Sequence, residues 1–257
     1  MQDLNITLIQ SDLAWEDKVR NLAIFTKHIR QAPETDIIVL PEMFNTGFSM
    51  NAAELAEAPD GETTQWMHEM AAAQNACVCG SLIIEEEEQY FNRLIWMYPD
   101  GHYEKYDKRH LFSIAGEDNV FTQGYERLLV EVKGWTICPM ICYDLRFPVW
   151  SRFRNDYDVL LYIANWPERR VYAWQQLLIA RAIENQCYVI GVNRIGADGN
   201  TVYHSGHSAV LDPMGERTWE LAHERAVYTT TLSARHLEDI RTKLPFQNDR
   251  DMFSVND

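Results

Sequence analysis

Residues 36–44 read D-I-I-V-L-P-E-M-F, and this stretch indicates the fold. Its first five residues are almost wholly apolar, which is typical of a strand that is covered on both faces of its sheet. Pro41 ends the strand, because proline has no N–H to donate to a neighbouring strand. Glu42 follows at once, at the mouth of the predicted sheet. A strand buried on both faces favours an α/β fold in which helices cover layered sheets.

Similar patterns extend from this strand in both directions along the chain. Alternation predicts a strand over residues 4–10, and an apolar stripe at helical spacing predicts a helix over residues 16–30. We expect further strands at residues 77–85, 91–98, 101–106, 135–142, 159–164, 188–193, 208–211 and 226–232, and helices at residues 63–75, 172–186 and 234–243. The acidic run at residues 85–88 is expected to be a solvated loop between two strands. Without a linker or an internal repeat, residues 1–257 are expected to form a single domain.

The charge and the hydropathy pattern exclude several classes of protein. The net charge is −15 and the sequence pI is about 4.9, which argues against nucleic acid or an anionic membrane as a partner. No run of about 18 consecutive apolar residues is present, so we expect no membrane-spanning helix. The first twelve residues have no basic region followed by an apolar stretch, and we therefore expect no secretory signal.

The cysteines point to a reducing compartment. Their number is odd, and their spacing fits no C-x-x-C metal pattern: Cys77, Cys79, Cys138, Cys142 and Cys187. Most lie in apolar runs, where a free cysteine is usually a small buried hydrophobic residue. We therefore predict a cytoplasmic protein whose thiols stay reduced.

Three motifs carry candidate chemistry, and each follows a predicted strand or hairpin. Glu42 could act as a general base, although a capping or salt-bridged glutamate is the simpler alternative. Lys108, in Y-D-K-R-H-L-F, could stabilise an oxyanion or be an ordinary surface lysine. Cys142, in C-Y-D-L-R-F-P, could be a nucleophile at a strand-to-turn junction or a buried structural cysteine. Together they would supply the nucleophile, base and oxyanion stabiliser of an acyl-transfer site, with the Tyr143 N–H as a second oxyanion donor.

These motifs together resemble the nitrilase (carbon–nitrogen hydrolase) superfamily, whose Glu–Lys–Cys triad occurs in this chain order. The resemblance extends from residue 4 to about residue 246. It implies a four-layer αββα sandwich that assembles as a homodimer or a larger oligomer. The segments N-D-Y-D-V-L-L-Y-I-A-N-W-P and A-R-A-I-E-N-Q-C-Y-V-I-G are similar to those of bacterial omega-amidases. That similarity implies hydrolysis of the terminal amide of 2-oxoglutaramate or 2-oxosuccinamate through a cysteine thioester, without a metal or an organic cofactor.

The resemblance also assigns roles within the site. It carries over Glu42, Lys108 and Cys142 as catalytic residues, and it suggests that Glu117 orients Lys108. Glu117 could equally be a solvated acid in the loop at residues 113–123.

The anionic substrate needs a partner for its carboxylate, and the first candidate is Arg146, because a guanidinium can bind a carboxylate through two hydrogen bonds. A structural role for a buried Arg146, paired with Asp144 or another acid, remains an equal alternative. Tyr143, Phe112 and Trp166 could line the pocket or simply belong to the core.

The sequence also leaves other functions open. Instead of an omega-amidase, the protein could be a nitrilase, a carbamoylase or an amidase of the same superfamily that acts on another small substrate. A catalytically silent binding protein with the same fold is a third possibility. His204 and His207 could suggest a metal site, but a loop between strands explains them. A catalytic pair of Cys142 with His110 is disfavoured, because papain-like sites place the cysteine at a helix N-terminus and Cys142 follows a strand.

Overall fold

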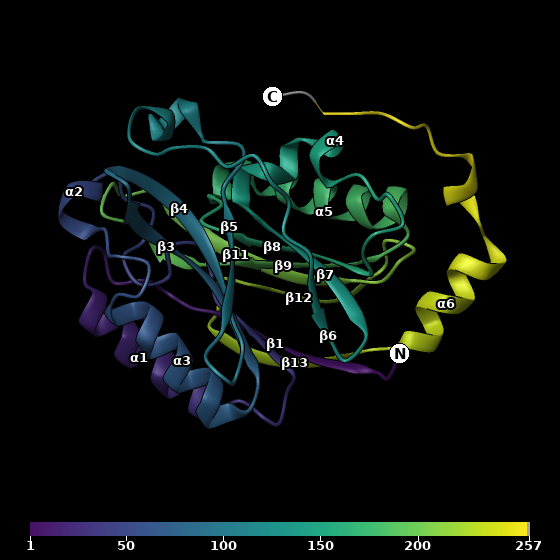
Figure 1. Ribbon diagram of the computed structural model, residues 1–257, viewed down its shortest axis with the longest axis horizontal. Coiled ribbons are helices and arrows are strands. Elements are labelled where there is room, and N and C mark those ends of the chain that lie inside the picture. The colour runs from purple at the N-terminus through teal and green to yellow at the C-terminus, as the bar shows by residue number, and fades with distance from the viewer. Residues whose placement is uncertain (256–257) are drawn as a thin grey trace.

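The computed structural model describes residues 1–255 and contains two stacked β-sheets between outer helices (Figure 1). One sheet has six strands in the order β13-β1-β2-β3-β4-β5. The other has seven, in the order β10-β11-β9-β8-β7-β6 with β12 paired to β11. Helices α1 and α3 cover the first sheet, and α5 covers the second. The predicted four-layer αββα sandwich is thereby confirmed.

The bounds of the elements are as follows. The first sheet contains β1 (Leu4–Gln10), β2 (Ile37–Val39), β3 (Cys77–Glu86), β4 (Gln89–Met97), β5 (Tyr103–Asp107) and β13 (Ala226–Leu232). The second contains β6 (Val130–Val132), β7 (Trp135–Ile141), β8 (Val159–Ala164), β9 (Tyr188–Asn193), β10 (Ile195–Ala197), β11 (Tyr203–Leu211) and β12 (Arg217–Ala222). The α-helices are α1 (Lys18–Gln31), α2 (Ala52–Leu55), α3 (Glu62–Gln74), α4 (Pro148–Ser151), α5 (Val171–Asn185) and α6 (Ala234–Lys243). Short 3₁₀ turns are η1 (Ser113–Ala115), η2 (Glu117–Asn119), η3 (Cys142–Arg146), η4 (Glu168–Arg170) and η5 (Phe246–Asp249).

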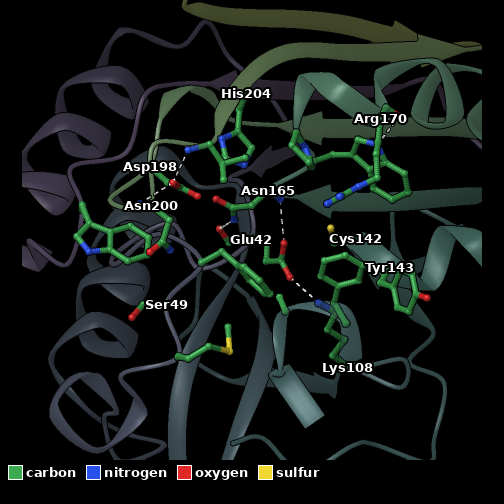
Figure 2. Close-up of a pocket in the computed structure, with 18 of the residues that line it drawn as sticks. Glu42, Ser49, Lys108, Cys142, Tyr143, Asn165, Arg170, Asp198, Asn200 and His204 are labelled. Carbon is green, nitrogen blue, oxygen red and sulfur yellow. Dashed lines mark hydrogen bonds and ion pairs between the residues drawn. The ribbon is translucent and has the colours of Figure 1, made fainter. Parts of the chain in front are cut away.

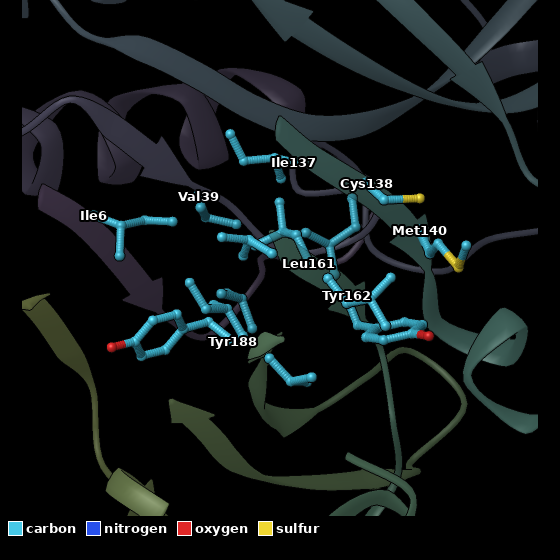
Figure 3. Close-up of a cluster of buried hydrophobic side chains, with 14 of the residues drawn as sticks. Ile6, Val39, Ile137, Cys138, Met140, Leu161, Tyr162 and Tyr188 are labelled. Atoms are coloured by element: carbon cyan, nitrogen blue, oxygen red, sulfur yellow. The ribbon is translucent and has the colours of Figure 1, made fainter. Parts of the chain in front are cut away.

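The apolar run at residues 36–40 is buried on both faces of β2, as predicted. Ile37 and Val39 belong to the core between the sheets, where Figure 3 shows Val39 beside side chains of the second sheet. Ile38 and Leu40 point the other way and pack with Phe25 of α1. Successive residues of a strand face opposite sides of the sheet, so a strand between a sheet and a helix layer needs apolar residues at every position.

The strand directions bring the candidate site together. β2 is parallel to β1 and β3 in the first sheet, and β7, β8 and β9 are mutually parallel in the second. The hairpin β3–β4–β5 returns β5 to the direction of β3. Because parallel strands end at the same edge of a sheet, residues that follow β2 and β5 share one edge, and residues that follow β7 and β8 share another.

One expectation about loops is wrong, and another is right only in part. His204 and His207 lie in β11 rather than in a loop, and the register between β11 and β12 shifts between Gly206 and Ser208. This bulge is held by Gln10 Oε1, which accepts a hydrogen bond from the Ser208 N–H at 3.0 Å. The acidic run is also shorter as a loop than expected, since β3 extends to Glu86 and β4 begins at Gln89. Within residues 1–255, no helix is long and apolar enough to span a membrane.

Candidate active site

Three strand ends place the predicted triad in one cavity. Glu42 follows β2, Lys108 follows β5 and Cys142 follows β7. All three side chains line the same cavity, which has a volume of about 490 Å³ (Figure 2). The cavity therefore lies between the edges of the two sheets, with Glu42 and Lys108 on one sheet and Cys142 on the other.

Lys108 lies between two buried carboxylates. Its Nζ donates to Glu42 Oε1 at 2.8 Å and to both oxygens of Glu117 at 2.9 Å. The three side chains are fully buried. The ring of Phe48 lies 5.2 Å below the ammonium. A surface role for Lys108 is therefore excluded by its position.

Glu117 is buried rather than solvated. It follows Gly116, whose φ of 76° lets the loop reverse direction between η1 and η2. Its carboxylate accepts hydrogen bonds from Phe112 N–H at 2.5 Å and Asn92 Nδ2 at 3.1 Å, in addition to those from Lys108. These contacts hold the carboxylate in one orientation, and the loop brings it to the ammonium.

Two asparagines that the sequence did not single out fix Glu42. Asn92 Nδ2 donates to Oε1 at 2.9 Å, and the Asn165 N–H donates to Oε2 at 2.8 Å. Asn165 Nδ2 also donates to the backbone carbonyl of Glu42 at 2.6 Å. Asn165 directly follows β8, while Asn92 lies inside β4. The carboxylate is thus held from both sheets.

Cys142 occupies a strained position at the start of a turn. Its φ is 45°, a left-handed conformation that is unusual for a residue other than glycine. The turn is fixed by the buried Asp144, whose carboxylate accepts from Ile141 N–H and His110 N–H, both at 3.0 Å. Such strain is characteristic of a nucleophile presented at the end of a strand.

The electrostatics of the site favour a protonated thiol at rest. Burial raises the pKa of Cys142 well above its usual range, and the charge of Glu42 raises it further while Lys108 opposes this. Burial disfavours the ammonium of Lys108, but Glu117 and Glu42 outweigh this effect and raise the lysine pKa. Burial also raises the pKa of Glu117, against the effect of Lys108. The lysine is therefore firmly charged, and the cysteine needs a base.

The four candidate substrate-contacting residues all line the cavity. They are Phe112, Tyr143, Arg146 and Trp166. The guanidinium carbon of Arg146 lies 5.0 Å from the centroid of the Trp166 ring. The rings of Phe112 and Tyr143 meet edge to face at 5.0 Å.

Asp144 is not the partner of Arg146, because its carboxylate is occupied elsewhere. It accepts from Tyr106 Oη at 2.7 Å and pairs with His110 Nδ1 at 2.8 Å. Among the described residues, no carboxylate forms an ion pair with Arg146. His110 stacks on Phe147 at 3.8 Å, so its contacts are those of a structural histidine.

Two neighbouring arginines that line the cavity, Arg169 and Arg170, were missed from the sequence. Arg170 ends η4, and its guanidinium carbon lies 4.9 Å from the centroid of Phe112. The sequence offered only one signal for Arg170, namely its position six residues after Ala164, the last residue of β8. In the part of the chain that the structure describes, no group of three or more His, Cys, Asp or Glu side chains could hold a metal ion.

Comparison with known proteins identifies the family. The model of a family described as carbon-nitrogen hydrolase matches residues 5–242. The chain belongs to the carbon–nitrogen hydrolase family. The hydrolase is 45% identical to the omega-amidase YafV of Escherichia coli (strain K12) over 256 residues, which are 99% of this chain and 100% of that protein. It is 29% identical to the 2-oxoglutaramate amidase of Bacillus subtilis (strain 168) over 252 residues, or 95% and 96% of the two chains.

A solved structure agrees with this assignment. The hydrolase superposes on XC1258 from Xanthomonas campestris, a CN-hydrolase superfamily protein with an arsenic adduct in its active site, with a TM-score of 0.97. The two are 43% identical, and the match covers 100% of both chains. The nitrilase resemblance of the sequence is therefore confirmed, and the protein is an enzyme that cleaves carbon–nitrogen bonds.

Proposed function

We propose that the hydrolase is an omega-amidase that converts the terminal amide of 2-oxoglutaramate or 2-oxosuccinamate to the acid and ammonia. The observation that carries this proposal is the buried Glu42–Lys108–Glu117 group in one cavity with Cys142 and an unpaired Arg146. The names of the similar proteins from E. coli and B. subtilis support the same substrate class.

In the proposed acylation step, Glu42 takes the proton of the Cys142 thiol, and the sulfur attacks the amide carbon to form a C–S bond. The resulting oxyanion is stabilised by the charge of Lys108 and by the Tyr143 N–H. The C–N bond then breaks as Glu42 returns its proton to the nitrogen, and ammonia leaves. A base is required here because burial keeps the pKa of Cys142 high.

The deacylation step uses the same groups. Glu42 removes a proton from water as the water oxygen attacks the thioester carbon, and the oxyanion is again stabilised by Lys108. The C–S bond breaks, and the proton held by Glu42 returns to the sulfur. Glu117 does not contact the reacting atoms in this scheme, and it instead positions Lys108. No step requires a metal or an organic cofactor.

The carboxylate of the substrate is assigned to Arg146. The Trp166 ring supports its guanidinium, and among the described residues no acid neutralises it. Tyr143 and Phe112 would pack against the short carbon chain, since small-molecule sites combine apolar walls with a few polar groups.

The test is ammonia release by the purified protein from 2-oxoglutaramate, glutamine, asparagine, an aliphatic amide and a nitrile. We expect release from the 2-oxo acid amide and none with Cys142→Ala. Release from another compound alone would keep the catalytic group and reject the substrate. If no compound is hydrolysed and Cys142 does not react with thiol reagents, a silent binding protein is favoured.

Two further features belong to this proposal. We infer that the hydrolase forms a homodimer, because the outer face of α5 exposes Tyr172 (75%) and Ile183 (53%), and a second copy of the chain would cover them. We also infer that it works in the cytoplasm. All five cysteines are free, and four of them are buried.

A further inference from the structure

We propose that Arg170 and Arg146 together form a clamp for the carboxylate end of the substrate, with Arg170 as a specificity-determining residue. This inference rests on the proposed function, because it assigns the anionic end of the 2-oxo acid amide. It adds a second guanidinium to the one identified from the sequence, and it predicts that the enzyme selects anionic over neutral amides.

The two guanidinium groups are held in place by aromatic rings of the cavity. Arg146 lies over Trp166 at 5.0 Å, and Arg170 lies over Phe112 at 4.9 Å. Trp166 Nε1 donates to the Arg170 carbonyl at 2.8 Å, so one indole supports both arginines. Such stacking fixes the plane of a guanidinium and leaves its N–H groups free for a planar anion.

Neither arginine is neutralised by the protein. Among residues 1–255, no carboxylate forms an ion pair with Arg146 or Arg170, although both are partly buried. Charges that are taken out of water are normally paired, so the partly buried guanidinium groups of Arg146 and Arg170, in a cavity that Arg169 also lines, indicate an anionic ligand. Arg170 also precedes the first turn of α5, which contains no acidic residue. The positive end of the helix dipole adds to the attraction.

The environment of Arg170 agrees with this assignment. Burial lowers its pKa, and the like charges of Arg169 and Arg146 lower it further. A carboxylate bound between the two guanidinium groups would relieve that repulsion. Figure 2 shows Arg170 on the same side of the cavity as Cys142 and Tyr143, whereas Asp198 and Asn200 lie on the opposite side. The anionic end of a short substrate would thus be held near the nucleophile.

The first test compares kcat/KM for 2-oxoglutaramate and for pentanamide, an uncharged amide of the same chain length. Arg170→Gln should lower kcat/KM for 2-oxoglutaramate by roughly 10- to 100-fold, the cost of losing a charged hydrogen bond, and change that for pentanamide less than threefold. Arg170→Lys should retain part of the preference. Arg154→Gln is the matched control, because Arg154 also lies over a ring, Phe253 at 5.0 Å, but outside the cavity. An equal loss on both substrates, or no loss on either, would overturn the clamp.

The second test does not depend on turnover. The product 2-oxoglutarate should protect Cys142 from iodoacetamide at pH 8.5, and Arg170→Gln should raise the half-protecting concentration by roughly 10- to 100-fold. If the parent protein fails to hydrolyse 2-oxoglutaramate but shows this Arg170-dependent protection, the proposed substrate is wrong and the clamp stands. If it hydrolyses 2-oxoglutaramate and protection is the same in Arg170→Gln, the clamp is wrong and the proposed function stands.

Discussion

Two carboxylates, Glu42 and Glu117, share one ammonium beside Cys142, and this imbalance of charge governs the chemistry of the thiol. The buried group has an excess of negative charge, so forming a thiolate next to it is unfavourable until a proton acceptor and a substrate are both present. The negative charge of Glu42 thus has two opposite effects. In the proposed mechanism it accepts the proton during the reaction, whereas at rest it helps to keep Cys142 protonated.

Glu42→Gln should separate these effects. Turnover should fall by roughly 100-fold or more, because the general base is lost. The pKa of Cys142, however, should move down toward its usual range, because a negative charge that raises it has been removed. The rate of Cys142 alkylation by iodoacetamide, measured as a function of pH, checks this. A lower thiol pKa moves the inflection of this rate–pH curve to lower pH. An inflection that stays in place or moves up would show that Glu42 does not act on the thiol.

Lys108→Met should damage both activity and stability. Turnover should fall on the order of 100-fold or more through loss of the oxyanion-stabilising charge. Removing the cation that lies between two buried carboxylates should also lower the free energy of unfolding by about 3–5 kcal/mol. Urea unfolding and kcat measure the two effects. Lys105→Met is the control, because Lys105 pairs with Glu86 at the surface and its removal should change little.

The stability loss in Lys108→Met should depend on pH in a defined direction. Burial raises the pKa of Glu117, so the folded protein retains that proton at a pH where the unfolded chain has lost it. Stability from this group is therefore present at low pH and is lost as pH rises through the folded pKa. Without the lysine, the deficit should be smaller at pH 5 than at pH 8. A deficit of equal size at both would mean that the carboxylates are stabilised by other donors.

At the level of strands and turns, the three candidate catalytic residues had a signal in the sequence because each lies at the end of a predicted strand or hairpin. Asn165 has the same kind of position after β8, but asparagine after a strand is also the ordinary composition of a turn. Asn92 had no signal at all, because it lies within β4, where strand alternation says which face a residue is on but not what it contacts. Its contacts with Glu42 and Glu117 arise from tertiary packing.

Helix α5 connects Arg170 of the proposed clamp to η3, the turn that begins with the proposed nucleophile Cys142 and is called the nucleophile turn below. It begins directly after Arg170, and Arg181 Nη2 donates to the carbonyl of Leu145 in η3 at 2.6 Å. The helix can lie close to the sheet because β9 has glycine at position 191. A Cβ there would lie 2.7 Å from the Trp174 ring and 2.8 Å from Leu178.

Gly191→Ala should therefore push α5 away from β9. We expect the free energy of unfolding to fall by about 1–3 kcal/mol, the usual cost of overpacking a core. Because Arg170 moves with the helix, KM for the anionic amide should rise as well. Chemical denaturation and steady-state kinetics measure these effects. Lys27→Ala, on the exposed side of α1 in the helix layer of the other sheet, should leave both unchanged. An unchanged stability in Gly191→Ala would show that α5 tolerates the displacement.

For the molecule as a whole, the layering was predictable from the apolar runs, whereas the edge of the second sheet was not. β12 is six residues long and none of them is buried, so its R-T-W-E-L-A sequence lacks the apolar pattern of a core strand. It is a strand because it pairs with β11. The long pairing of β1 with β13, from Leu4 with Leu232 to Gln10 with Ala226, also joins residues that no local pattern relates.

The proposed homodimer is the inference about the whole molecule that can be tested most directly. Tyr172 and Ile183 are exposed on α5, and Met214, 44% exposed, lies beside Gly215, where a Cβ would touch Ile183. Single exposed apolar residues are common, but three along one helix and its neighbouring turn favour a contact surface.

Ile183→Lys should therefore raise the dimer dissociation constant at least tenfold, because a charge would be buried at the interface. Sedimentation equilibrium at several concentrations measures this. Val19→Lys is the control, since Val19 is 78% exposed on α1, in the helix layer of the other sheet.

Because α5 also holds Leu145 through Arg181, the dissociated Ile183→Lys variant should lose turnover in proportion to its monomer fraction. A parent protein that is monomeric at tens of micromolar, or a Val19→Lys variant that dissociates equally, would show that α5 is not the interface. Dissociation without loss of turnover would instead show that the nucleophile turn is supported within one chain.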